Sequence, residues 1–207
     1  MYKRQIWDQT DEKLTIQASQ SNPIKKNPYN DLPLIIPISL AIFFGDNKKI
    51  EKTVVLKTKK QEFIFKNLRS NLQIPLVTYF RELSSPVDWE SDTTLDEKFL
   101  ILKYEKDYFT LSNTVKVLYK KIISCRLDER PDHNIENKLI DILVSFIKNK
   151  EINLSLLSEF LNIPTFAEIE SEMENIDPLK IYKTIDELNH LFGTKLKKEL
   201  YLSLIHI

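Results

Sequence analysis

The stretch DTTLDE at residues 92–97 is the point where the chain changes its hydrophobic period. Thr94 and Glu97 have the spacing of a capping box, in which each side chain accepts a hydrogen bond from the backbone N–H of the other residue, so a helix is predicted to begin here. Strand-like alternation precedes this point, and helix-like spacing follows it. The sequence therefore predicts a β domain that ends at residue 91 and an α-helical domain that begins at residue 92.

The half before residue 92 has the pattern of short strands. In residues 14–19, apolar side chains alternate with polar ones, which is typical of a strand with one buried face. Residues 34–44 are apolar at nearly every position, which indicates a strand buried on both faces, and Pro37 indicates an edge or a bulge. Short strands at this spacing favour a β-sandwich. Further strands are predicted at residues 53–58, 62–66 and 76–83, with turns at residues 22–33 and 45–47.

The half after residue 92 has the pattern of five or six short helices. Besides the helix at residues 95–104, the spacing predicts helices at residues 108–125, around an apolar stripe at residues 135–147, and at residues 154–161. A capping box at residues 165–168 and the pair Asp177-Pro178 begin further helices, and Gly193 is predicted to end the last one. Helices joined by small turns, without strands between them, predict a stacked helical array.

Composition and charge exclude several classes of protein. Hydrophobic residues make up 42% of the 207 residues, which is enough for a packed core. The 30 basic and 30 acidic residues balance, so nothing indicates binding to nucleic acid or to a membrane surface. The longest apolar run, residues 34–44, is too short to span a bilayer. Cys125 is the only cysteine, which excludes an internal disulfide and favours a reducing compartment, the cytoplasm.

The residue types that carry catalysis are scattered. His133 is expected in a solvated loop and His190 near a helix end, and no H-E-x-x-H motif accompanies them or His206, so no zinc site is predicted in this chain. Cys125 is expected to be a buried structural thiol. Two clusters are predicted to be solvated helix surface: the glutamates Glu168, Glu170, Glu172 and Glu174, and the lysines Lys116, Lys120 and Lys121. No catalytic, cofactor-binding or metal-binding residue is therefore predicted.

The two ends of the chain are expected to have an origin of their own. Residues 1–5, MYKRQ, and residues 202–207, LSLIHI, read as translations of the two strands of one short DNA element, the transposase end-sequence used to prepare sequencing libraries. Both ends are therefore expected to be adapter-derived scars and are set aside from the fold. The natural part would be at most residues 6–201 of a longer protein, with a sandwich over residues 6–91 and a helical domain over residues 92–201.

Four blocks of sequence follow one another in a recognisable order. A strand that ends in Ser-Gln precedes a proline-rich connector and an apolar strand with Ile-Pro, then come two further strand blocks, and finally a helical block. In order, they are LTIQASQ (14–20) with LIIPISL (34–40), FIF (63–65), IPL (74–76) with LSSPV (83–87), and IPTFAEI (163–169) with IDP (176–178) and Ile181. In this order they resemble the region that follows the catalytic domain of bacterial aminopeptidase N, and the resemblance covers residues 7–201.

The resemblance implies a fold and a function. Bacterial aminopeptidase N is a zinc metallopeptidase of the gluzincin type that removes N-terminal residues from peptides. Its catalytic domain, with the H-E-x-x-H helix, precedes an immunoglobulin-like β-sandwich and a C-terminal α-solenoid of the armadillo/HEAT kind. This chain would be the sandwich, without its first strand, and the truncated start of the solenoid. Zinc and peptide substrates would belong to the parent enzyme, whose own catalytic domain would be the partner of this part, with no nucleic acid and no membrane.

Two segments depart from the family pattern. TLSN at residues 110–113 follows Phe109 where the family has an Arg-Trp-Glu-Ala-like segment, and VDWE at residues 87–90 replaces an apolar and Lys-rich continuation. The chain is expected to be a diverged member, inactive by itself, which braces the catalytic domain and restricts access to its chamber. The sequence leaves open a non-enzymatic sandwich-plus-solenoid module that binds peptides or partner proteins.

Overall fold

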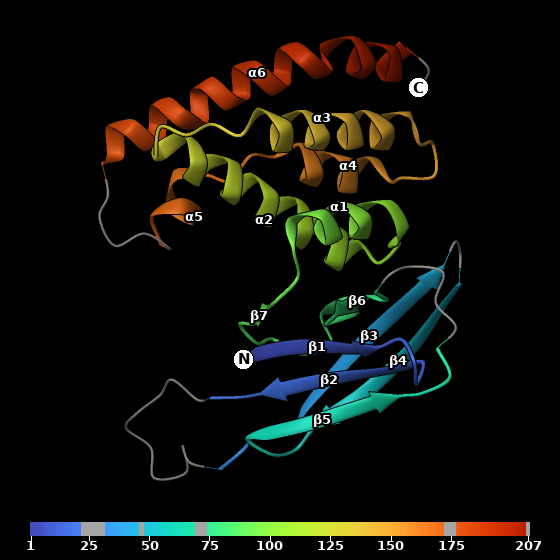
Figure 1. Ribbon diagram of the computed structural model, residues 1–207. Coiled ribbons are helices and arrows are strands. Elements are labelled where there is room, and N and C mark those ends of the chain that lie inside the picture. The colour runs from blue at the N-terminus through green and yellow to red at the C-terminus, as the bar shows by residue number, and fades with distance from the viewer. Residues whose placement is uncertain (22–31, 46–47, 69–73, 172–176, 206–207) are drawn as a thin grey trace. The chain divides into compact units, whose positions relative to one another are not determined.

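The computed structural model describes residues 1–21, 32–45, 48–68, 74–171 and 177–205 (Figure 1). The chain forms two compact units, Met1–Thr110 and Leu111–Ile207. The first unit contains the strands, the first helix and the start of the second helix, and the second unit contains the rest of the helices. The predicted order of a β-sandwich followed by helices is therefore confirmed, although the first helix packs with the strands.

The strands form two sheets. One sheet has the order β5-β2-β1-β7 and the other has the order β4-β3-β6. All neighbouring strands are antiparallel except β1 and β7, which are parallel. The strands are β1 (Tyr2–Asp8), β2 (Lys13–Ser19), β3 (Ile36–Gly45), β4 (Lys48–Leu56), β5 (Lys60–Phe65), β6 (Leu76–Tyr79) and β7 (Glu90–Ser91).

Strand β3 is buried on both faces, as its apolar sequence predicts. On one face, Leu40 and Ile42 enter the core between the sheets. On the other face, Phe43 packs with Ile101 of helix α1 (Leu95–Tyr104). Pro37 lies where β3 pairs with β4 alone, because β6 pairs only with residues 40–43. The missing N–H of Pro37 therefore faces a local edge of the sheet, as predicted.

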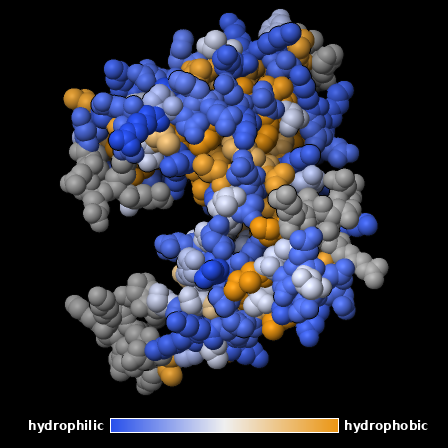
Figure 2. Space-filling view, in the orientation of Figure 1, coloured by the Kyte–Doolittle hydropathy of each residue, from blue (hydrophilic) through white to orange (hydrophobic). Residues whose placement is uncertain are grey.

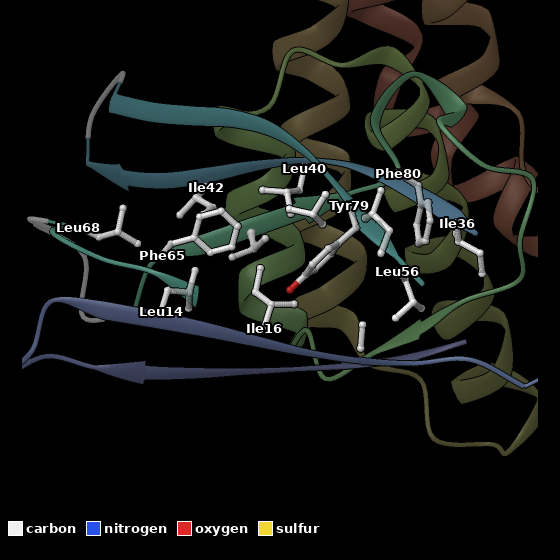
Figure 3. Packing of buried hydrophobic residues seen from close by; sticks show 14 residues of the cluster. Leu14, Ile16, Ile36, Leu40, Ile42, Leu56, Phe65, Leu68, Tyr79 and Phe80 are labelled. Carbon is white, nitrogen blue, oxygen red and sulfur yellow. The ribbon is translucent and has the colours of Figure 1, made fainter. Parts of the chain in front are cut away.

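The core of the sandwich lies between the two sheets (Figure 3). Figure 3 shows the side chains of both sheets pointing toward one another, with Phe65 and Leu68 at one end and Phe80 and Ile36 at the other. Burying an aliphatic or aromatic side chain of this kind stabilises a fold by about 1.5–3 kcal/mol. Buried members of the cluster include Leu14, Ile16, Ile38, Leu40, Ile42, Leu56, Phe65, Leu68, Tyr79 and Phe80.

Strand β1 has no counterpart among the predicted strands. It pairs with β2 from Tyr2, opposite Ser19, to Asp8, opposite Lys13. Its alternation is the reverse of an ordinary half-buried strand, because Lys3 is fully buried while Ile6 on the other face is exposed. The residues set aside as adapter-derived thus form most of β1, and their origin stays a prediction. The edge of β2 that a missing first strand would expose is covered by β1.

The helices begin close to where the sequence predicts. Thr94 and Glu97 form the capping box at the start of α1, and the side chains of Asn153 and Asp177 accept hydrogen bonds from the first turns of α4 and α6. After α1 come α2 (Tyr108–Leu127), α3 (His133–Lys148), α4 (Leu154–Leu161), α5 (Phe166–Glu170) and α6 (Pro178–Ile205), and the 3₁₀ turn η1 (Arg81–Leu83) lies in the first unit.

The helices of the second unit enclose a core of their own. Helix α3 packs against α4 and α6. Tyr119 of α2 lies 5.4 Å from Phe192 of α6, and Phe146 of α3 lies 5.0 Å from Phe160 of α4, measured between ring centroids. Figure 2 shows a mainly hydrophilic surface on this unit, with hydrophobic side chains visible between the helices. The predicted helical stripes are therefore the buried faces of the helices.

Several local predictions are wrong. Gly193 does not end a helix but lies inside α6, because buried Phe192 and Leu196 on either side continue the apolar stripe. His133 is the first residue of α3 rather than part of a loop, and His190 lies in the middle of α6. Cys125 is half-buried. The predicted turns at residues 22–31 and 46–47, together with Glu172 and Glu174, lie outside the described residues.

Candidate functional site: a buried ion pair at the start of the helices

Arg81 lies on a strained turn directly after strand β6. The neighbouring residues Phe80, Glu82 and Leu83 have φ angles of 54°, 55° and 51°, in the left-handed region that residues with a Cβ rarely adopt. The side chain of Arg81 is only 10% exposed. Strained backbone of this kind persists where surrounding contacts determine the conformation. Here those contacts come from the segment between α1 and α2.

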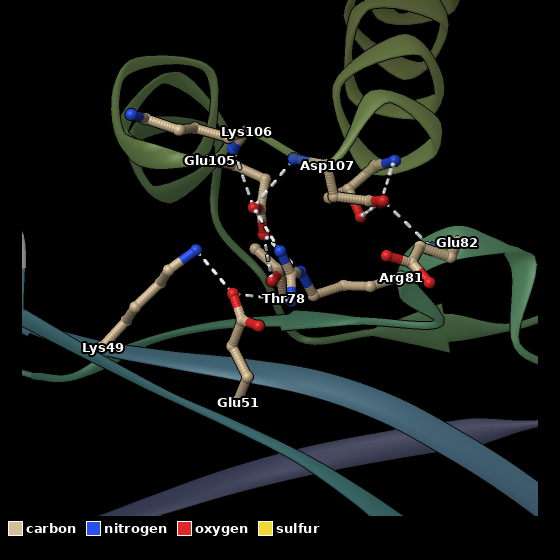
Figure 4. Close-up of polar contacts among 9 residues, drawn as sticks. Lys49, Glu51, Thr78, Arg81, Glu82, Glu105, Lys106 and Asp107 are labelled. Carbon is tan, nitrogen blue, oxygen red and sulfur yellow. Dashed lines mark hydrogen bonds and ion pairs between the residues drawn. The ribbon is translucent and has the colours of Figure 1, made fainter.

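Glu105 binds Arg81 from that segment, and its side chain is completely buried. Its carboxylate accepts hydrogen bonds from Arg81 Nε and Nη2, both at 3.2 Å, and from Thr78 Oγ1 at 2.6 Å (Figure 4). It also accepts the backbone N–H groups of Lys106 at 2.8 Å and Asp107 at 3.0 Å. Two-point binding of a guanidinium fixes both charge and orientation. Glu105 thus joins the end of β6 to the end of α1.

Arg81 has a second carboxylate partner at the outer side of the cluster. Its Nη1 lies 3.0 Å from Oε1 of Glu51 on β4, and Glu51 also pairs with Lys49. The hydrogen bond from Lys49 and the charge of Arg81 lower the pKa of Glu51, although its desolvation acts in the opposite direction. Burial lowers the pKa of Arg81, but Glu105 and Glu51 more than offset this and raise it overall. The guanidinium therefore stays charged.

Asp107 adds a second connection between the two segments. Its Oδ1 accepts the backbone N–H of Glu82 at 3.1 Å. Its Oδ2 accepts both the backbone N–H of Thr110, at 2.9 Å, and the Thr110 hydroxyl, at 2.6 Å. Asp107 therefore caps the first turn of α2 and holds the strained turn at Glu82. Arg81, Glu105 and Asp107 together connect the turn after β6 to the segment between α1 and α2. We call these three residues the Arg81–Glu105 junction.

The chemistry of the junction is structural rather than catalytic. The Glu105 carboxylate is completely buried among hydrogen-bond donors, and the Arg81 guanidinium is shared between two carboxylates, so neither group is available to bind a substrate. The cluster contains no histidine and no thiol. Its arrangement fixes the first turn of α2 to the turn after β6 within the first unit, and the geometry supports no reaction.

A second buried carboxylate lies in the helical unit. Glu136 of α3 is 2% exposed and accepts a hydrogen bond from Arg126 Nε at 2.7 Å. The Nδ1 atom of His133 lies 3.0 Å from its other oxygen. Burial raises the pKa of Glu136, but the hydrogen bonds from Arg126 and His133 outweigh it and lower the pKa overall. This histidine therefore has a buried structural carboxylate as its partner.

The remaining predicted surface groups lie apart from both clusters. Lys116 pairs with Glu159 at 3.4 Å, and Glu159 also accepts the hydroxyl of Ser112. Glu168 caps the start of α5 through Thr165. In the described part of the chain, no group of three or more His, Cys, Asp or Glu side chains could hold a metal ion. No helix among the described residues is long and apolar enough to cross a membrane.

Sequence reasoning did not identify the Arg81–Glu105 junction. Arg81 and Glu105 are 24 residues apart, and neither has a spacing that predicts the other. Only Asp107 carries a local signal, because an aspartate directly before a helix is a common N-cap. The strained turn at Phe80 also has no sequence signal. A left-handed backbone is normally indicated by glycine or asparagine, and this turn contains neither.

Each half of the chain matches the model of a known domain family. Residues 2–92 match the model of DUF3458, a domain of unknown function with an Ig-like fold. Residues 95–205 match the model of DUF3458_C, a domain of unknown function made of ARM repeats. The two matches meet where the hydrophobic period changes.

Two known proteins show the wider similarity. Aminopeptidase N of Escherichia coli (strain K12) is 21% identical over 201 residues, which cover 91% of this chain and 23% of that protein. The crystal structure of Legionella pneumophila aminopeptidase A in complex with aspartic acid matches 99% of this chain and 23% of its own, with a TM-score of 0.78 and 15% identity. The chain thus spans about a quarter of these relatives, and its resemblance to aminopeptidase N is confirmed. The chain belongs to the DUF3458_C family of ARM-repeat domains, and it carries the Ig-like DUF3458 domain in front of that domain.

Proposed function

We propose that this chain is a non-catalytic part of an aminopeptidase that removes N-terminal residues from peptides. The observation that carries the proposal is the match of nearly the whole chain, both domains in order, to proteins named as aminopeptidases. Since the chain spans about 23% of each, most of the parent protein would lie outside it. Catalysis would then belong to that other part.

Zinc belongs to the same proposal. The described residues provide no group of ligands that fits a metal ion. A zinc ion would therefore be held by the part of the parent outside this chain, where it would activate the attacking water. In this proposal, none of the residues described here takes part in that step, and the parent is cytoplasmic.

The role proposed for this part is mechanical. It would brace the catalytic domain, and its helical repeats would restrict access to the chamber where peptides are cut. The Arg81–Glu105 junction supports a bracing role, because a buried two-point ion pair keeps the start of α2 fixed to the sandwich-bearing unit.

A second candidate is a non-enzymatic module that binds peptides or partner proteins. The observation that favours it is an exposed apolar surface on the helical unit. Leu179 and Tyr182 of α6 are 81% and 58% exposed, and the Tyr182 ring stacks on Phe166 at 4.6 Å between centroids. Exposed aromatic and aliphatic groups of this kind are common at binding surfaces.

The reading frame upstream of residue 6 separates the two candidates. An in-frame H-E-x-x-H motif with a downstream glutamate supports the aminopeptidase, whereas a genuine start codon a few residues upstream contradicts it. A second experiment uses the purified 207-residue chain with aminoacyl chromogenic substrates, with and without added zinc. We expect no hydrolysis, and zinc-dependent turnover would show that the chemistry lies in this chain after all.

A further inference from the structure

The amine of Lys3 lies in a cage of aromatic rings at the end of the sandwich. Its Nζ is 3.4 Å from the ring centroid of Tyr79, 3.6 Å from that of Trp89 and 4.7 Å from that of Phe80. Lys49, Lys52 and Lys103 each approach a single ring, as Lys52 approaches Phe65 at 5.8 Å. Three ring faces that converge on one amine therefore set Lys3 apart from ordinary surface lysines.

The amine makes its close contacts with these rings and not with a hydrogen-bond acceptor among the described residues. The side chain of Lys3 is completely buried, and its Nζ has no hydrogen-bond partner in the described part of the chain. Contacts between N–H groups and ring faces are weak but favourable. A protonated amine would carry three N–H groups without an acceptor, which is far more costly in a buried site than an uncharged amine.

The cage itself is held independently of Lys3. Trp89 packs against Tyr79 at 6.1 Å and against Phe80 at 5.6 Å between ring centroids. Tyr79 and Phe80 are nearly fully buried, so surrounding side chains restrict both rings. Strand β1 is anchored by its pairing with β2, so shortening Lys3 would leave the three rings in place around an empty space.

We propose that Tyr79, Phe80 and Trp89 form a binding site for the amino head group of a short alkyl chain, which Lys3 occupies from within the same chain. The ligand class is an uncharged primary alkylamine. This site goes beyond the proposed scaffold function and does not depend on it.

The charge state of the site follows from its surroundings. Burial lowers the pKa of Lys3 to about 5, although the carboxylate of Asp92 acts in the opposite direction. Burial raises the pKa of the Tyr79 phenol, and the negative charges of Asp92 and Glu97 raise it further. The phenol therefore stays neutral at pH 9. A ligand that replaces Lys3 would therefore enter as the free amine.

The test is chemical rescue of the variant Lys3→Ala by n-propylamine, which supplies the four heavy atoms that the substitution removes. At pH 9, we expect n-propylamine to raise the melting temperature of the variant saturably, by about 5–10 °C at roughly 100 times its Kd, and to leave the wild type unchanged. The same amine should have no effect on Lys52→Ala, the matched control for a lysine beside one ring.

Three results would overturn the proposal. The first is equal rescue by 1-propanol, since the space would then be an unselective apolar hole. The second is rescue that survives the further substitution Trp89→Leu. The third is an affinity that does not change with pH, because a free amine requires the apparent affinity to rise up to about 100-fold from pH 7 to pH 9. Calorimetric titration of the folded Lys3→Ala variant gives the same answers without relying on its melting.

Discussion

Arg81 and Glu105 form a buried ion pair in which two guanidinium nitrogens each bind a different carboxylate oxygen at 3.2 Å. The pair joins the strained turn after β6 to the end of α1, across 24 residues of sequence. Because the Glu105 side chain is completely buried and that of Arg81 is only 10% exposed, each charge depends strongly on the other for its stabilisation. The stability of the first unit should therefore respond strongly to the loss of either group.

The first prediction concerns Glu105→Ala. This change leaves the Arg81 guanidinium buried with a single exposed partner, so we expect a loss of about 3–5 kcal/mol in the free energy of unfolding, measured by urea denaturation. The matched control is Glu51→Gln, which removes the half-exposed partner of the same arginine and should cost less than about 1 kcal/mol. Equal losses of stability from the two changes would contradict the claim that Glu105 is the main partner of Arg81.

The second prediction concerns Gly193→Ala. Gly193 lies inside α6 and is exposed. Apart from its chain neighbours and the backbone of its own helix, no described atom lies within 4 Å of the position that a Cβ would take. Alanine restricts the unfolded chain and favours the helix, so the change should stabilise the protein by about 0.5–1 kcal/mol. Thermal unfolding followed by circular dichroism measures this. A loss of stability would mean that α6 ends or bends at Gly193, as predicted from sequence.

The third prediction concerns pH and the helical unit. The pKa of Glu136 is lowered in the folded state, so its contribution to stability is complete above the ordinary glutamate pKa and is lost as the pH falls through the lowered value. Glu136→Gln should therefore destabilise the protein at pH 7 and change its stability much less at pH 3.

Urea denaturation of Glu136→Gln and of the wild type at both pH values measures this difference. His133→Ala is the matched control, because it removes the exposed partner and leaves the hydrogen bond from Arg126 in place. A destabilisation by Glu136→Gln that is as large at pH 3 as at pH 7 would show that charge is not the cause.

Features that depend on neighbouring residues could be predicted from sequence. The capping box of Thr94 and Glu97 is made by residues three apart, and β3 needs only its own apolar composition to indicate two buried faces. The same local signals placed the starts of α4 and α6 at Asn153 and Asp177.

Features that depend on distant contacts could not be predicted. Gly193 is helical because Phe192 and Leu196 are buried on the core side of α6, and this contact outweighs the preference of glycine for helix ends. Glu105 and Arg81 are 24 residues apart and are brought together only by the tertiary structure. Strand β1 was not predicted because residues 1–5 had been set aside from the fold. Its buried side also carries Lys3, a residue that normally marks the exposed side.

The last prediction concerns Lys3→Met. Burial lowers the pKa of Lys3 to about 5, well below its value in the unfolded chain. The unfolded state therefore binds one more proton between pH 10 and pH 5, and Lys3 costs the folded state increasing stability as the pH falls through this window. Methionine keeps the length of the side chain without the ionisable amine. Since a change of one in a pKa is worth about 1.4 kcal/mol, it should stabilise the protein by about 3–5 kcal/mol at pH 7.

Urea denaturation of Lys3→Met and of the wild type at pH 5, 7 and 9 measures the effect. The gain should be smallest at pH 9, grow toward pH 5 and level off below it. Lys60→Met, which replaces an exposed lysine on β5, should change stability by less than about 0.5 kcal/mol at each pH. A gain from Lys3→Met that stays constant from pH 9 to pH 5 would show that the buried amine keeps its proton, held by the three rings and Asp92.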